Sequence, residues 1–92
     1  MSGAQCEVEI VNQRGLHARA SAKFVAAVAE LPNGVAVTVE KQGNSANGNS
    51  ILGLMMLGAA KGDTVTINAS GDGCEDAIAT LKTLVEDGFG EP

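Results

Sequence analysis

Three segments that alternate apolar and polar side chains, set among longer stretches with helical spacing, most constrain the fold of this chain. Residues 6–10, 35–40 and 64–69 place apolar side chains at every second position, which is typical of strands with one buried face. A short polar segment, 44–47, is expected to pair back as a fourth strand in a hairpin. The pattern predicts an α+β fold in which three helices cover one side of a four-stranded antiparallel sheet.

Two amphipathic helices are predicted from apolar stripes with helical spacing. The first spans residues 18–30 and ends at the Pro-Asn-Gly turn 32–34. The second is expected to be capped by Asp72, with Glu75 three residues later, and to end at Gly88. The two stripes consist of Ala20, Phe24, Ala27, Val28 and Leu31, and of Ala77, Ile78, Leu81, Leu84 and Val85.

A third, short helix is predicted after Ser50, where seven successive residues lack a charged or hydrogen-bonding side chain. A short helix on the outside of a small domain cannot bury its whole circumference, so part of this apolar surface should be exposed. Methionines suit a surface that accepts partners of different shapes. The expected docking residues are Ile51, Leu52, Met55 and Met56, and the alternative is that these residues belong to the core.

The length of 92 residues predicts a single domain, residues 1–92, that can hold a core but not a deep cleft. No apolar run approaches the roughly 20 residues of a membrane helix, and the first residues lack the basic and apolar regions of a signal peptide. We therefore expect a cytoplasmic protein without membrane contact. Cys6 and Cys74 are expected to be packing residues, because no second histidine or C-x-x-C pair completes a metal site.

Charge is unevenly distributed along the chain. The formal net charge of −5 and the absence of Trp and Tyr disfavour nucleic acid as a partner. No acidic residue lies between Glu9 and Glu30. That interval holds Arg14, Arg19 and Lys23, half of the six basic residues. The sequence predicts a basic pole in an otherwise acidic protein, although three charges can also form an ordinary solvated face.

The basic interval contains the only histidine, His17, at the start of the first predicted helix. Free N–H groups and the helix dipole favour an anion at a helix N-terminus. Unprotonated imidazole is a nucleophile near neutral pH, and the guanidinium of Arg19 can hold phosphoryl oxygens. These features predict phosphoryl transfer onto His17 without a metal ion or cofactor. The alternative is an ordinary surface histidine.

Three stretches of the chain carry a family resemblance. The segment from Asn12 to Val25 resembles the active-site segment of the HPr family, the histidine-containing phosphocarriers of the bacterial phosphoenolpyruvate-dependent phosphotransferase system. The segment from Asn49 to Gly58 is similar to the second motif of that family, and residues 62–67 match its last strand. The resemblance covers nearly the whole chain and implies an open-faced β-sandwich of order β-α-β-β-α-β-α.

The resemblance also implies roles and partners. His17 would accept the phosphoryl group through Nδ1, Arg19 would be its charge partner, and Ser50 would be a regulatory phosphorylation site. Enzyme I would supply the phosphoryl group and an EIIA-type domain would receive it. HPr kinase/phosphorylase would modify Ser50 in organisms that possess this enzyme. The protein would therefore be a carrier in a phosphotransfer relay and not an enzyme.

Residues around the histidine are assigned less specific roles. Asn12 matches the asparagine before the active loop. Gly15 is expected to supply an unusual backbone angle or close approach for a partner, whereas Leu16 and Ala20 are expected to contact partners. The family usually has proline at the position of Ala20, and alanine there restores one N–H near the phosphate. Alanine at this position and the run 53–56 are more similar to carriers of phosphotransferase systems that are largely regulatory than to dedicated sugar-uptake carriers.

Two functions of other classes stay open at this point. An acylphosphatase-like enzyme could use Gln13, Gly15 and Arg19 as a phosphate loop and would hydrolyse acyl phosphates without His17. A purely regulatory module would dock through residues 51–56 and would bind partners equally well with glutamine in place of His17.

Overall fold

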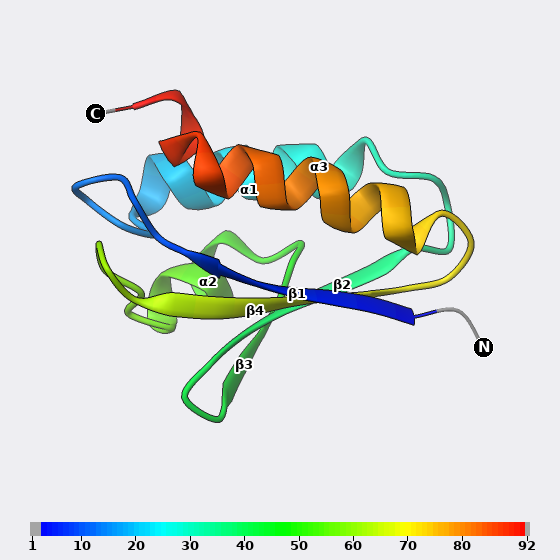
Figure 1. The fold of residues 1–92 in the computed structure, drawn as a ribbon, viewed down its shortest axis with the longest axis horizontal. Helices are drawn as coiled ribbons and strands as arrows, with labels where there is room; N and C mark the ends of the chain where they lie inside the picture. Colours follow the sequence, from blue (N-terminus) through cyan, green and yellow to red (C-terminus); the bar gives the residue numbers. More distant parts are fainter. Residues whose placement is uncertain (1–2, 92) are drawn as a thin grey trace.

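Four strands and three α-helices follow one another in the order β-α-β-β-α-β-α (Figure 1). The computed structural model describes residues 3–91. Its strands are β1 (Gly3–Glu9), β2 (Ala36–Lys41), β3 (Asn44–Asn47) and β4 (Thr64–Ser70). Its helices are α1 (Ala18–Ala29), α2 (Ile51–Met56) and α3 (Cys74–Glu86), followed by the short 3-10 segment η1 (Gly88–Gly90). The predicted elements, including the hairpin strand 44–47, are confirmed.

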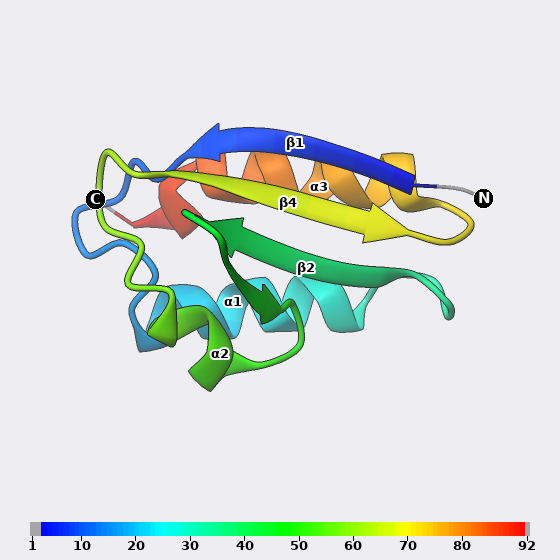
Figure 2. The same ribbon diagram turned by 90° about the horizontal axis from the view of Figure 1, so that it is seen from below.

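The strands form one antiparallel sheet in the order β1-β4-β2-β3. Val8 lies opposite Val65 between β1 and β4, and Val39 lies opposite Ile67 between β2 and β4. Matching apolar positions therefore face the same side of neighbouring strands. Helices α1 and α3 run antiparallel across that face, and α2 lies beside β3 and α1 (Figure 2).

The core lies between this face of the sheet and the two long helices. Ile10, Phe24, Ile67 and Leu81 are at most 2% exposed, so the centres of the stripes and alternating positions read from the sequence are buried. Other members are only partly buried: Cys6, Ala27, Val28, Leu31, Val35 and Leu84. Phe89, from η1, is also buried and adds a second aromatic ring. Since η1 packs into the core, the chain end beyond α3 is fixed against the start of α1.

The predicted cap of α3 is wrong. The N-cap is Gly73 in a left-handed conformation (φ 89°), and no side chain accepts a hydrogen bond there. Asp72 lies one residue before the N-cap. The N–H of Cys74 donates instead to the backbone carbonyl of Gly71, at 3.1 Å. The first turn of α3 instead carries Glu75 and Asp76, whose negative charges favour a helix N-terminus.

Both cysteines are free, as expected for packing residues. Cys74 is buried and Cys6 is partly buried, and burial raises the pKa of the Cys6 thiol. This keeps the thiol in its unreactive protonated form. Within residues 3–91, no helix has the length and apolar character needed to cross a membrane.

Candidate functional site

His17 is the N-cap of α1. Its backbone is extended (φ −75°, ψ −177°), and Nδ1 accepts a hydrogen bond from the backbone N–H of Arg19 at 3.2 Å. In neutral imidazole only one ring nitrogen carries a hydrogen, and a contact in which Nδ1 accepts favours the tautomer with the hydrogen on Nε2. Nδ1 therefore faces the first turn of α1, where helix N–H groups point outward.

The other side of the His17 ring contacts a carboxylate from the far end of the chain. Nε2 lies 2.7 Å from Oε1 of Glu91, and the same oxygen accepts a hydrogen bond from Nδ2 of Asn12 at 2.9 Å. Asn12 is 1% exposed and also donates to the carbonyl of Gly15 at 2.8 Å. The hydrogen bonds from His17 and then from Asn12 hold the pKa of the Glu91 carboxyl below its usual range.

The C-terminal segment is shaped so that Glu91 reaches the ring. Gly88, Phe89 and Gly90 all have positive φ angles (64°, 58° and 74°), which reverse the chain direction after α3. A left-handed conformation at the non-glycine residue Phe89 costs on the order of 1 kcal/mol. Burial of its ring and a 2.6 Å hydrogen bond from Lys23 Nζ to its carbonyl hold it there.

The loop before the helix is fixed by its backbone. Gly15 has φ 63°, and a Cβ at this position would collide with the carbonyl of Ala59 and the Cα of Ala60. The expected unusual angle is confirmed, but the close approach is to the protein's own loop before β4. The N–H groups of Gly15 and Leu16 are bonded to carbonyls, which disfavours the acylphosphatase-like phosphate loop.

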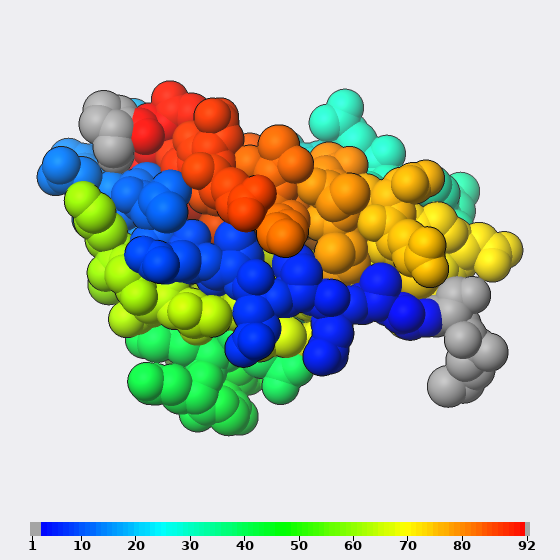
Figure 3. Space-filling view, in the orientation of Figure 1, coloured from blue at the N-terminus to red at the C-terminus, as the bar shows by residue number. Residues whose placement is uncertain are grey.

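Figure 3 shows three chain segments meeting at one end of the molecule: the loop before α1 in blue, the C-terminal segment in red and the α2–β4 loop in yellow-green. A pocket of about 440 Å³ lies at this end. Its lining residues are Gln13, Arg14, His17, Arg19 and Glu91. Among residues 3–91, neither arginine of this pocket forms an ion pair, so both guanidinium groups are available to an anion.

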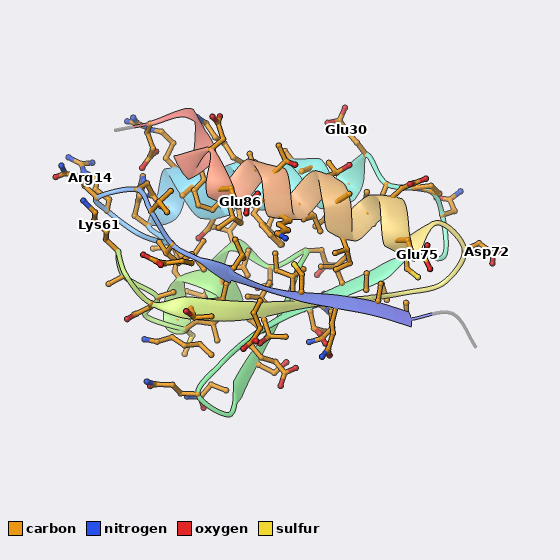
Figure 4. All side chains as sticks on the ribbon, viewed as in Figure 1. Arg14, Glu30, Lys61, Asp72, Glu75 and Glu86 are labelled. Carbon is orange, nitrogen blue, oxygen red and sulfur yellow. The ribbon has the colours of Figure 1, made fainter. Side chains whose placement is uncertain are left out.

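Basic side chains gather at one end of the molecule. Figure 4 shows Arg14 and Lys61 at the end that holds η1, and Asp72 and Glu75 at the opposite end. The structure therefore contains the predicted basic pole. The prediction is corrected in one respect. The interval 10–29 contains no acidic residue, but the fold brings the carboxylate of Glu91 to His17.

Two residues expected to contact partners are buried. Leu16 is 6% exposed and Ala20 is 0% exposed, and both belong to the hydrophobic core. The N–H of Leu16 donates to the carbonyl of Ala59 at 2.9 Å, which holds this residue against the loop before β4, and Ala20 lies on the buried stripe of α1 with Phe24. The expectation that these side chains form part of a docking surface is wrong.

The short helix α2 matches its description from the sequence. Ser50 is its N-cap, with Oγ accepting from the N–H of Gly53 at 2.9 Å. Leu54 is fully buried, which anchors the helix. The side chains expected to be exposed are so: Ile51 41%, Leu52 67%, Met55 40% and Met56 77%.

Sequence reasoning missed Glu91. An acidic residue near the chain end, 74 positions from His17, carries no local motif that links it to the histidine. The available signal was the Gly-Phe-Gly sequence at 88–90, which indicates a chain reversal with an aromatic anchor. The sequence indicates Asn12 only through its family match, and the structure places its buried amide between Gly15 and Glu91.

The fold and the site define a class: a small α+β protein that presents a histidine as the cap of a helix N-terminus, beside two uncommitted arginines. The family model described as "PTS HPr component phosphorylation site" matches residues 4–87. The chain belongs to the HPr family of the phosphotransferase system, and the resemblance read from its motifs is confirmed.

Individual relatives agree with this assignment. Phosphocarrier protein HPr of Neisseria meningitidis serogroup A is 43% identical over 84 residues, covering 91% of this chain and 92% of that protein. Phosphocarrier protein NPr of Escherichia coli K12 is 37% identical over 87 residues, covering 91% and 92%. The crystal structure of HPr-C-His from Thermoanaerobacter tengcongensis superposes with a TM-score of 0.89 at 39% identity, covering 97% and 98%.

Proposed function

We propose that this protein is a phosphoryl carrier, in which Nδ1 of His17 accepts a phosphoryl group from phosphorylated enzyme I and passes it to an EIIA-type domain. One observation carries the proposal: Nδ1 lies 3.2 Å from the N–H of Arg19 at the N-terminus of α1, beside the uncommitted Arg14 and Arg19. A nucleophile, helix N–H donors and cationic side chains therefore surround the same point in space.

The incoming phosphoryl group takes the place of the Arg19 N–H at Nδ1. That N–H and the N–H groups of Ala18 and Ala20, for which the described residues offer no other acceptor, can then donate to phosphoryl oxygens. The guanidinium of Arg19 adds charge-assisted hydrogen bonds. Binding through a few exposed contacts stays moderate, as a carrier needs, because it must release the group to the next protein.

Partners dock on the apolar surface of α2, formed by Ile51, Leu52, Met55 and Met56. Helix α2 packs beside α1 (Figure 2), so one partner can contact this surface and the basic pole at the same time. A partner with an apolar patch and an acidic rim would complement both. Ser50, at the start of α2, is a regulatory phosphorylation site for a kinase of the HPr kinase/phosphorylase type. A phosphate there would add charge at the edge of the docking surface.

The test is intact mass spectrometry after incubation with phosphoenolpyruvate and a bacterial enzyme I. The wild type should gain one phosphoryl group that is lost in mild acid and kept in alkali, as a phosphoramidate is, and His17→Ala should gain none. Ser50→Ala is the matched control and should be phosphorylated like the wild type. An acid-labile adduct that persists on His17→Ala would exclude His17 as the acceptor.

A further inference from the structure

We propose that Glu91 is a positioning residue for phosphoryl transfer: it keeps the proton on Nε2 of His17 before, during and after the reaction at Nδ1. The inference rests on the proposed function for its role in transfer, but its first consequence, the tautomer of His17, is independent of that function. Glu91 lies outside both motifs of the family resemblance and was found only through the fold.

The geometry fixes which atom of Glu91 faces the ring. Oε1 accepts from both Nε2 of His17 (2.7 Å) and Nδ2 of Asn12 (2.9 Å). Because the second hydrogen of the Asn12 amide is held by the carbonyl of Gly15, the amide cannot turn its oxygen toward Glu91 without losing two hydrogen bonds. The ring is thus presented with an acceptor at Nε2, which stabilises the Nε2–H tautomer and leaves the lone pair at Nδ1.

The surroundings explain why a carboxylate is needed at this position. Arg14 and Arg19 line the pocket, Lys23 lies near Glu91 and the N-terminus of α1 adds positive potential. Each of these disfavours a cationic ring. Glu91 is the one acidic residue among those that line the pocket in the described part of the chain. Its second oxygen, Oε2, is buried without a hydrogen-bond partner among the described residues, so its charge is not spread over further donors.

The reaction then needs no proton transfer. The Nδ1 lone pair attacks phosphorus, the bond between phosphorus and the donor atom of enzyme I breaks, and its electron pair stays with the donor. Nδ1–P forms while Nε2 keeps its hydrogen, so the ring becomes cationic and is paired with the Glu91 carboxylate. In the onward transfer the Nδ1–P bond breaks, its electron pair returns to the ring, and neutral Nε2–H imidazole leaves. A cationic phosphohistidine has the better leaving group, so Glu91 keeps the phosphoryl group transferable.

The structure also shows that this placement is built and not incidental. Three successive left-handed residues, 88–90, turn the chain toward His17, although one of them is a phenylalanine that bears the strain. Lys23 of α1 holds the carbonyl of Phe89 at 2.6 Å. Backbone strain held by packing and a specific side chain is typical of segments that position a functional group.

The test measures the ring nitrogens of His17 by long-range ¹H–¹⁵N correlation NMR, at about pH 8, where imidazole is uncharged. In the wild type the Nε2–H tautomer should dominate. In Glu91→Ala the ratio of Nε2–H to Nδ1–H should fall by roughly tenfold, because the hydrogen-bond acceptor at Nε2 is lost. Glu91→Gln should keep the wild-type ratio, since Asn12 orients its amide oxygen toward the ring. Glu86→Ala, which removes an exposed acid at the end of α3, is the charge-matched control.

Phosphorylated samples separate the charge from the hydrogen bond. At about pH 8, phosphohistidine in both Glu91→Ala and Glu91→Gln should lose the Nε2 proton and hydrolyse several-fold more slowly than in the wild type or Glu86→Ala. Unchanged tautomer ratios in a folded Glu91→Ala variant, or equal hydrolysis rates in all four proteins, would overturn the inference. If His17 takes up no phosphate even in the wild type, the proposed function fails instead, and the tautomer measurement still decides the position of the proton.

Discussion

The N-termini of α1 and α3 lie at opposite ends of the molecule and are stabilised in opposite ways (Figures 1 and 4). Helix α3 starts at a left-handed glycine without a side-chain cap, and Glu75 and Asp76 in its first turn offset the positive end of the helix dipole. Helix α1 has no acidic residue in its first turn, and Arg19 adds a further positive charge there.

The difference shows which helix N-terminus has its positive dipole end balanced by acidic residues of its own first turn. The start of α3 is balanced by neighbours in sequence, so nothing has to approach it. The start of α1 has no acidic residue in its own first turn, and the carboxylate that reaches it, Glu91, contacts Nε2 and leaves the Nδ1 side of the His17 ring without an anion. An anion from outside the chain could bind on this side, as the proposed phosphoryl-carrier function requires.

Arg19→Glu should have the largest effect, because it gives α1 the same charge at the second helical position that Glu75 gives α3. We expect phosphoryl transfer from enzyme I to fall by more than roughly a hundredfold, since a repulsive charge replaces a charge-assisted hydrogen bond. Arg19→Ala should slow transfer by about ten- to a hundredfold. Stopped-flow or quench-flow transfer rates measure both.

Thermal unfolding of the same variants is the control. Glutamate near a helix N-terminus should leave the melting temperature unchanged or slightly higher, so that stability and transfer move in opposite directions. Wild-type transfer rates in a folded Arg19→Glu variant would show that the positive charge at this helix end has no part in the reaction.

Ser50→Asp tests the second side-chain cap, that of α2. Aspartate is a good N-cap, so the fold should keep its stability. The added charge lies beside the exposed Ile51 and Leu52 and should weaken association with enzyme I by roughly tenfold, through desolvation and repulsion of an acidic rim. Isothermal titration measures the affinity.

Ser50→Asn is the matched control, because asparagine caps a helix equally well without a charge. It should bind enzyme I like the wild type. Equal affinities for Ser50→Asp and Ser50→Asn would mean that Ser50 is a helix cap and nothing more.

Features with a local sequence period were predictable. The alternation at Val37 and Val39, the stripe through Phe24 and the all-apolar run after Ser50 each depend on geometry within one element, and the structure has them as expected. The exposed α2 side chains followed from a simple limit, since a six-residue helix at the surface cannot bury every side.

Features that depend on chain reversal or long-range packing were not predictable. Glu91 reaches His17 only because η1 turns back and Phe89 enters the core. Leu16 was expected at the surface, but a hydrogen bond to Ala59 holds it against the loop before β4. The Asp72 cap failed for a local reason, because left-handed Gly73 begins the helix one residue later than a capping aspartate would.

Ala20→Pro should have a smaller effect than the substitutions of charge. It removes the N–H of the third residue of α1, which we propose donates to the phosphoryl group, and it should shorten the lifetime of phosphohistidine about two- to threefold. Proline is tolerated in a first helical turn, so α1 should persist, as circular dichroism can verify. An unchanged hydrolysis rate with α1 intact would show that this donor does not contribute.

The smallest expected effect concerns acid stability at the His17 end. Asp63 is bonded to the N–H of Ala60 and to Lys41, and these contacts, the backbone bond first, hold its pKa below the ordinary value of 3.8. Glu91 is held by His17 and Asn12, and its pKa lies below the ordinary value of 4.5. A lowered folded-state pKa means that the unfolded chain binds more protons in this window, so stability rises with pH there.

The contribution of both carboxylates is therefore fully present above their ordinary values and is lost as the pH falls through the lowered ones. Urea unfolding of the wild type should show a falling free energy of unfolding below about pH 4.5, with a smaller slope in Asp63→Asn and in Glu91→Gln.

Because both partnered carboxylates lie near the start of α1, the loss should be concentrated there. Amide hydrogen exchange at acidic pH should accelerate first around His17 and η1, and only later in the first turn of α3. Acceleration that begins at α3 would reverse the order and show that the carboxylates at the other end of the molecule govern acid unfolding.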